Sequence, residues 1–285
     1  MPSPCTLACN WPPPCFLPAR PEQEGDSYCS LKVPQMPKEA PASEQYRNRL
    51  YAAYGKHFQD SGHVFDAEAS RRWGKPYRHY LRGWLPTNRD AEIVELACGG
   101  GRLLHFLKNA GYQQLTGVDI SPDQVALSKQ VIGNVVRSDI LVFLEGKQNC
   151  FDLVIGLDIV EHFTKPEVLQ LLDLIYASLK PGGRLILQTP NAESPWASTH
   201  RYNDFSHEVC FNPNALSRIL RLSGFSDIHA REAGPILIGY SAFSSLRSLV
   251  WSFIRLTLKL WNVVETGSIG SGIFTRIFLI SGVKR

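Results

Sequence analysis

Two histidines in polar stretches carry the side chains best suited to proton transfer near neutral pH. His162 follows Glu161 directly, and His207 lies in a polar run that ends at Glu208. A neutral imidazole can take a proton from a reacting hydroxyl, so His162 or His207 could act as a general base. With Glu161, the two histidines also offer donors that suit a divalent ion. Their distant positions give no local metal-ligand spacing, however, and no metal is expected. The same side chains could instead brace their loops through hydrogen bonds.

A second group of residues suits the binding of a nucleoside-type cofactor. The apolar run Ile93–Leu96 is followed closely by three consecutive glycines, Gly99–Gly101. Glycine lets the backbone approach a ligand because it has no Cβ, and the N–H groups of a helix that begins there point toward that ligand. About 20 residues later, Asp119 ends another apolar run and is placed to accept hydrogen bonds from a ribose diol. Ser121 is expected to cap the next helix, which would leave Asp119 for the ligand.

Strand and helix patterns alternate through the middle of the chain, and these elements would position both groups. Strands are expected at 92–96, 114–118, 134–138, 152–157, 184–189 and 227–233, with a last one at 274–281. Helices are expected at 101–110, 122–131, 165–179 and 213–223. The third helix begins with a capping box, Thr164 with Glu167. This alternation is typical of βαβ units, which form a parallel sheet with right-handed crossovers.

The N-terminal residues differ in composition from the rest. Residues 1–43 are rich in Pro, Ser and Glu without periodicity, so we expect a disordered tail. Residues 44–88 are aromatic-rich and predict a helical cap that packs on the sheet or covers the cofactor through Tyr46 or Trp73. The seven cysteines show neither a disulfide framework nor zinc spacing. With no signal peptide expected either, these features predict a cytoplasmic protein.

The segment 235–272 reads as a helical insertion before the last strand. Within it, residues 246–264 are mostly apolar, and the polar residues form one narrow stripe on a helix. Arg247, Arg255 and Lys259 argue against a helix that spans a membrane. Three interpretations stay open: a helix buried against its own domain, a helix at the inner face of a membrane with its basic stripe toward the headgroups, and a dimer contact. The formal net charge of +4 is too small to predict nucleic-acid binding.

Further motifs follow the glycine turn in a consistent order. Ser138-Asp139-Ile140 ends the third expected strand, Phe151 to Asp158 covers the fourth, and Leu179 to Leu185 joins a helix to the fifth through Pro-Gly-Gly. Together these motifs resemble the class I S-adenosylmethionine-dependent methyltransferases over about residues 90–230. Ala97 stands where that family has the first glycine of the turn. The resemblance implies an α/β fold: a Rossmann-like, seven-stranded, mostly parallel sheet with helices on both faces, an antiparallel last strand and a helical insertion before it.

The resemblance also implies the roles of individual residues, with S-adenosyl-L-methionine as the cofactor. The glycine turn would hold the amino-acid part of the cofactor, and Asp119 would bind its ribose. Residues at the ends of the following strands would contact its adenine and its sulfonium. The implied cofactor-binding residues are Glu95, Ala97, Gly99, Gly101, Asp119, Ile120, Asp139, Ile140 and Leu157. The domain 89–285 would then be the methyltransferase domain.

The two histidine segments resemble particular branches of this family. The Glu161-His162 pair is similar to one in ubiquinone-biosynthesis-type O-methyltransferases, and Asp204 to Glu208 is similar to a run in bacterial glycan-modifying methyltransferases. The resemblance implies O-methylation of a sugar, a lipid-linked glycan or a quinone-like molecule, with His162, His207 and Glu161 as candidate catalytic residues. Two alternatives remain. One is an NAD-dependent oxidoreductase on a similar fold, although this chain has Leu104 where the glycine motif of such enzymes, Gly-x-Gly-x-x-Gly, has a later small residue. The other is a catalytically inactive cofactor-binding partner protein.

Overall fold

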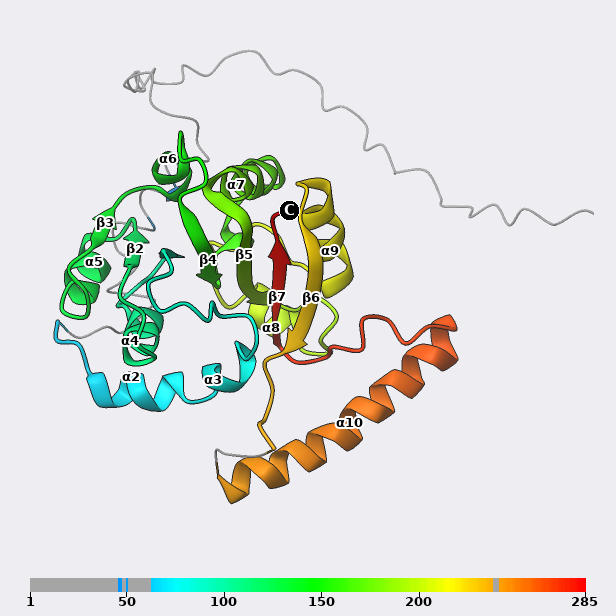
Figure 1. Cartoon of the computed structure of the whole chain (residues 1–285). Coiled ribbons are helices and arrows are strands. Elements are labelled where there is room, and N and C mark those ends of the chain that lie inside the picture. Colours follow the sequence, from blue (N-terminus) through cyan, green and yellow to red (C-terminus); the bar gives the residue numbers. More distant parts are fainter. Residues whose placement is uncertain (1–45, 48–49, 51–62, 238–240) are drawn as a thin grey trace, which may run out of the picture. The chain divides into compact units, whose positions relative to one another are not determined.

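The computed structural model describes residues 46–47, 50, 63–237 and 241–285. Their centre is one seven-stranded sheet in the order β3-β2-β1-β4-β5-β7-β6 (Figure 1). The strands are β1 (Ile93–Leu96), β2 (Leu115–Asp119), β3 (Val135–Arg137), β4 (Phe151–Leu157), β5 (Leu179–Pro190), β6 (Ser226–Glu232) and β7 (Ile277–Val283). Only β7 runs antiparallel to its neighbours, β5 and β6. The expected mostly parallel sheet with an antiparallel last strand is confirmed.

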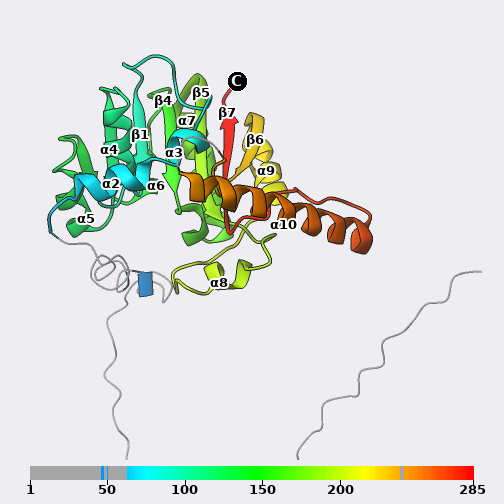
Figure 2. The ribbon, with the colours of Figure 1, turned by 90° about the horizontal axis from the view of Figure 1, so that it is seen from below.

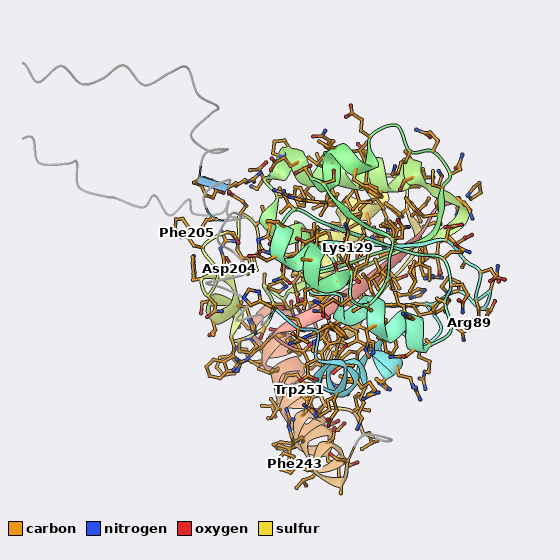
Figure 3. The ribbon with its side chains drawn as sticks, turned by 90° about the vertical axis from the view of Figure 1, so that its left-hand side faces the viewer. Arg89, Lys129, Asp204, Phe205, Phe243 and Trp251 are labelled. Atoms are coloured by element: carbon orange, nitrogen blue, oxygen red, sulfur yellow. The ribbon has the colours of Figure 1, made fainter. Side chains whose placement is uncertain are left out.

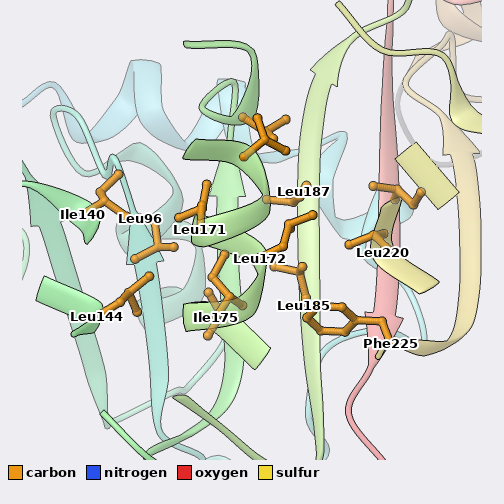
Figure 4. Packing of buried hydrophobic residues seen from close by; sticks show 14 of the residues in the cluster. Leu96, Ile140, Leu144, Leu171, Leu172, Ile175, Leu185, Leu187, Leu220 and Phe225 are labelled. Carbon is orange, nitrogen blue, oxygen red and sulfur yellow. The ribbon is translucent and has the colours of Figure 1, made fainter. Parts of the chain in front are cut away.

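Helices cover both faces of the sheet, as expected. They are α2 (Ala67–Gly74), α3 (Tyr77–Tyr80), α4 (Arg102–Asn109), α5 (Pro122–Ser128), α6 (Ile140–Leu144), α7 (Lys165–Ser178), α8 (Ala197–Arg201), α9 (Pro213–Leu222) and α10 (Ala242–Thr266), with a 3-10 turn η1 (Val160–His162). One core joins α6, α7 and α9 to the sheet, and the other joins α3, α4 and α5 to it. Figure 4 shows the first core, where leucines of α7 face Leu185 and Leu187 of β5.

Local sequence signals account for the ends of the helix before β5. The capping box is present at the start of α7, where the Glu167 carboxylate accepts a hydrogen bond from the Thr164 N–H at 2.7 Å. The helix ends at Ser178 before the Pro-Gly-Gly run, and the chain continues directly as β5. The helix thus lies between β4 and β5, whose carboxyl ends carry the candidate catalytic segments.

The N-terminal cap is described only in part. Its aromatic stripe covers two short helices, α2 and α3, and the turn after them. Tyr77 of α3 and Trp84 of the turn are buried, and Trp73 of α2 stacks on Tyr77. The predicted tail 1–43 lies outside the described residues. No helix in the described part of the chain is long and apolar enough to cross a membrane.

The insertion contains a single long helix, α10, which leaves the sheet after β6 and returns at β7. In Figures 1 and 2 its C-terminal half extends past β6, the edge strand of the sheet. Only Ser244 of this helix is buried, so the first of the three interpretations, a helix buried against its own domain, is wrong. In the membrane interpretation the polar stripe would face headgroups. In the structure this stripe faces the domain itself, because Arg255 contacts Glu232 of β6.

Candidate functional site

The glycine turn joins β1 to α4 through backbone of unusual geometry. Ala97, Gly99 and Gly101 have φ angles of 53°, 49° and 82°, in the left-handed region that glycine adopts most easily. The Cys98 N–H donates to the Val118 carbonyl at 2.9 Å, which holds the turn against the end of β2. A side chain at Gly101 would meet the backbone of Ser128 at 3.1 Å. Glycine is therefore required at that position by both φ and packing.

Asp119, the last residue of β2, ties the turn to the start of α5. Its Oδ2 accepts from the Gly99 N–H and its Oδ1 from the Ser121 N–H, both at 2.8 Å. The expectation that Ser121 would cap α5 and so leave Asp119 free is wrong, because the Ser121 side chain makes no cap bond. Burial raises the pKa of Asp119, while these backbone bonds oppose the rise. Each carboxylate oxygen has a second lone pair, so the carboxylate can still accept from a ligand.

Glu95 lies beside Asp119, on the neighbouring strand β1. The side chain is buried, and its Oε2 has no hydrogen-bond partner among the described residues. Burial raises the pKa of Glu95 well above its ordinary value; the Leu104 N–H opposes the rise and nearby Asp119 adds to it. A buried acceptor without a partner is costly. A ligand donor at this point would therefore be stabilising.

The remaining predicted cofactor residues lie at the ends of neighbouring strands. Asp139 caps α6, and its Oδ1 accepts from the Leu141 and Val142 N–H groups at 2.8 and 3.3 Å. Ile140 is buried behind this cap, and Ile120 is 39% exposed after β2. Leu157 ends β4 and is half-buried. The fold thus brings all nine residues to the carboxyl ends of β1 to β4, the edge where ligands bind such sheets.

The two candidate histidines come together although they are distant in sequence. Their rings lie 4.8 Å apart between centroids, in an edge-to-face arrangement. His162 ends the turn η1 after β4, and His207 follows α8 after β5. The N–H groups of Glu208 and Val209 both donate to the Glu161 carbonyl, at 2.8 and 3.1 Å, which joins the two segments.

A hydrogen-bonded chain fixes the tautomer of His162. The Ser206 hydroxyl donates to Asp204 Oδ1 at 2.6 Å, and the same hydroxyl lies 2.9 Å from His162 Nδ1. When the single proton of the Ser206 hydroxyl points to Asp204, the Ser206 oxygen is an acceptor, and this arrangement favours an Nδ1–H on the neutral ring of His162. This leaves Nε2 as the nitrogen with the lone pair. Burial lowers the pKa of His162 to about 4, and the nearby His207 acts in the same direction.

Glu161 and His207 have atoms whose hydrogen-bonding capacity is not used. Glu161 is 1% exposed; its Oε2 accepts from the Thr189 hydroxyl at 3.0 Å, while its Oε1 has no partner among the described residues. His207 Nδ1 is buried and is likewise without a partner there. Together with His162, these residues offer three possible metal-ligand atoms within 4.8 Å of one another. The sequence argument against a metal, which was their separation, is therefore removed by the fold.

Several residues of this site were not anticipated. Ser206 and Asp204 complete the chain to His162, and Asp158 holds the positive φ of 53° at the end of β4. Asp158 accepts from the Gln188 amide, which in turn accepts from the buried Tyr77 hydroxyl at 3.0 Å. The sequence signal for Asp158 was its position just after a strand; Gln188 and Tyr77 gave none. A cleft of about 420 Å³ between α3, β6 and α10 contains none of the predicted site residues.

Comparison with known proteins places this site in context. The model of the family described as methyltransferase domain matches residues 65–230, more than half of the chain. A ubiquinone biosynthesis O-methyltransferase of Coxiella burnetii is 28% identical over 165 residues, which cover 50% of this chain and 69% of that protein. A mouse small RNA 2'-O-methyltransferase is 25% identical over 146 residues, 45% of this chain but only 37% of that protein.

A solved structure supports the fold over a longer span. The crystal structure of a S-adenosylmethionine-dependent methyltransferase from Archaeoglobus fulgidus has a TM-score of 0.56 and 22% identity, and it covers 82% of this chain and 99% of that one. The likeness extends over nearly the whole of that protein, including a sheet of this kind.

Proposed function

Because the chain belongs to the methyltransferase-domain family, we propose that it transfers the methyl group of S-adenosylmethionine to a hydroxyl oxygen. The enzyme class and the cofactor follow from the family and its relatives, which favour them over the NAD-dependent alternative. The acceptor is the proposed part: a hydroxyl of a sugar, a lipid-linked glycan or a quinone-like small molecule. The observation that carries it is the Asp204–Ser206–His162 chain, since a hydroxyl needs a base.

The residues around the glycine turn fit this cofactor. Glu95 Oε2, buried and without a partner among the described residues, suits the ammonium group of the amino-acid part. The remaining lone pairs of Asp119 suit the two ribose hydroxyls. Among the described residues, a Cβ built at Gly99 would have only Gln124 within 4 Å, so no other described side chain closes in on the turn at that point. When bound, the cofactor supplies an electrophilic methyl group on sulfur.

The other predicted residues would complete the cofactor site. Asp139 uses Oδ1 to cap α6, and we assign its second oxygen to the adenine amino group, beside the Ile140 N–H. Ile120 is exposed enough to pack on the adenine ring. Leu157 would lie under the sulfonium, at the end of the strand that leads to His162.

In this proposal His162 accepts the proton of the acceptor hydroxyl at Nε2. The Ser206 oxygen holds Nδ1–H, so the ring keeps the tautomer that can accept. A pKa near 4 keeps the ring neutral at pH 7, although it makes the ring a weak base. Most of the acceleration would therefore come from aligning the hydroxyl with the methyl group. His207 and Glu161 would orient the acceptor beside His162.

The same cluster supports a second role, the binding of a divalent cation. Two imidazoles and a carboxylate form a donor set that such ions accept. Two of these side chains have buried atoms without partners in the part of the chain that the structure describes. A bound ion would lower the pKa of the acceptor hydroxyl directly. His162, His207 and Glu161 would then be ligands rather than a base and its neighbours.

A peripheral membrane contact through residues 246–264 belongs to the same proposal. A lipid-linked acceptor would be held in a bilayer, so the enzyme would have to work at its surface. Support comes from the exposed apolar residues of α10.

The acceptor can be found with cofactor that carries a labelled methyl group. Purified protein is incubated with aqueous and organic fractions of a cell extract, and labelled products are identified by mass spectrometry. We expect an O-methyl product, formed by the wild type and lost in His162→Gln, while both bind S-adenosylhomocysteine equally in calorimetry. Label on nitrogen or carbon would refute the proposal.

A parallel series separates the base from the metal. Protein is dialysed against EDTA, and Mg²⁺, Mn²⁺ or Zn²⁺ is added back. Full activity after dialysis supports the base, whereas activity restored only by an ion supports the metal role.

A further inference from the structure

The helix α10 packs on the domain with its polar side. Ser244 exchanges hydrogen bonds with the backbone of Ile236, its hydroxyl donating to the Ile236 carbonyl at 2.8 Å. The Trp251 indole and Arg255 both donate to Glu232 Oε2, at 3.2 and 2.9 Å. These residues recur at helical spacing, so they define one face. That face is occupied by the protein itself.

The opposite face is apolar and exposed. Leu246, Leu249, Phe253, Leu256 and Leu260 have exposed fractions of 58%, 60%, 72%, 64% and 63%. Further exposed apolar side chains widen this face on both sides; they are Phe243, Val250, Ile254, Trp261, Val263 and Val264. We call these eleven residues the outer face of α10. A surface helix of a globular protein normally has the reverse arrangement, with the apolar side against the core.

The outer face is wide. At 100° per residue, its members occupy about half of the helix circumference, from Val263 round to Ile254. A two-stranded coiled coil needs only a narrow seam of residues spaced by three and four. A helix that lies in a lipid interface needs a broad apolar side such as this one. The width therefore favours a lipid surface over a single partner helix.

Charge supports the same occupant. From residue 234 to the C-terminus the chain has six basic residues and one acidic residue. Of the basic residues, Arg255 is paired with Glu232 and Lys284 donates to the Leu179 carbonyl, so neither counts toward headgroup binding. Arg247, on α10, and Arg276, in the return segment to β7, are both exposed. Such cations attract anionic headgroups, and their stems can lie along apolar surface.

The outer face is connected to the acceptor side of the candidate site. After α10 the chain passes Ser271, whose N–H donates to Glu193 Oε1 at 2.8 Å, and the Ile273 carbonyl, which accepts from Asn191 at 2.8 Å. Residues 191–193 lead into α8 and then to Phe205, which is 79% exposed and adjoins Ser206. Figure 3 shows Phe205 at the outside of the segment that follows α8, and Phe243 at the N-terminal end of α10.

We propose that the outer face of α10 lies on the surface of an anionic phospholipid bilayer and brings the acceptor side of the site to the membrane. The inference deepens the proposed function and rests on it for the class of acceptor, a lipid-linked hydroxyl compound. It reverses the orientation expected from the sequence, because the apolar side rather than the basic stripe enters the lipid. Arg255 stays bound to Glu232.

The test is sedimentation of the full chain with vesicles, without turnover. We expect the wild type to sediment with vesicles that contain phosphatidylglycerol and less with phosphatidylcholine alone. Phe253→Asp should weaken the partition by about tenfold or more, because a charge replaces a large apolar group in the interface. Ser252→Asp is the matched control: it adds the same charge one residue away, at the polar edge, and should retain binding.

Each alternative outcome is decisive. Calorimetry with S-adenosylhomocysteine verifies that every variant is folded. Wild type that stays in the supernatant, or equal sedimentation of Phe253→Asp, overturns the inference. Light scattering that finds a dimer, which becomes a monomer in Phe253→Asp, would also overturn it and assign the outer face to a second copy. Vesicle binding with N-methyl products would refute the proposed function alone.

Discussion

The replacement Asp119→Asn tests the cofactor site without requiring an acceptor. Asp119 accepts the Gly99 and Ser121 N–H groups, each at 2.8 Å, one on each oxygen. In asparagine one of these oxygens becomes an NH2 group, which would face a backbone N–H. The ribose would also lose a hydrogen bond to a charged acceptor, which contributes about 1.5–3 kcal/mol. The dissociation constant of S-adenosylhomocysteine should therefore rise about 10- to 100-fold.

Calorimetry measures this change, and a cycle separates its two causes. A 2'-deoxy analogue of S-adenosylhomocysteine should bind the wild type more weakly, but it should lose much less affinity in Asp119→Asn if the ribose contact is real. Asp123→Asn makes the same chemical change on the exposed side of α5 and should bind as the wild type does. Affinity of Asp119→Asn within twofold of the wild type would refute the ribose assignment.

Two further predictions concern the catalytic segment and its support. Ser206→Ala removes the acceptor of His162 Nδ1–H and should lower the rate constant of methyl transfer by about tenfold, with unchanged binding of S-adenosylhomocysteine. Ser206→Thr keeps a hydroxyl and should restore most of the rate. A rate unaffected by either change would show that the tautomer of His162 is fixed by another contact. Burial raises the pKa of Glu167, but hydrogen bonds from Arg47 and Thr164 outweigh this and hold it at about 2, below its ordinary 4.5. Ionised Glu167 therefore stabilises the fold above pH 4.5, and this contribution, about 2 kcal/mol, is lost as the pH falls toward 2. Urea unfolding should show Glu167→Gln less stable than the wild type at pH 7 and nearly equal to it near pH 2.5; a constant difference would contradict the assignment.

The sheet and the cofactor edge could be predicted from sequence because their signals are local. Short apolar runs, the three glycines and the Thr164–Glu167 box each depend on neighbours in the chain. The strand boundaries therefore agree closely for β1 to β4. The long β5 was seen only in its second half, because Pro181 and two glycines interrupt its pattern.

The candidate catalytic cluster could be predicted only in part because its contacts are distant in sequence. His162 and His207 were identified by residue type, but nothing local brings Ser206 to His162 Nδ1. The orientation of α10 was missed for a different reason. Its polar stripe was recognised, but a half-buried acceptor on another element, Glu232, binds Arg255 and so turns that stripe inward.

The position of α10 between two paired strands has a consequence for how such a protein can evolve. Glu232, at the end of β6, pairs with Phe278, near the start of β7, so the chain leaves the sheet and returns to it at adjacent points. Neighbouring antiparallel strands can be joined by a short turn. The segment between them can therefore lengthen, shorten or change its residues while the sheet register is preserved. The surface that this segment presents can thus change independently of the strand ends that form the candidate site.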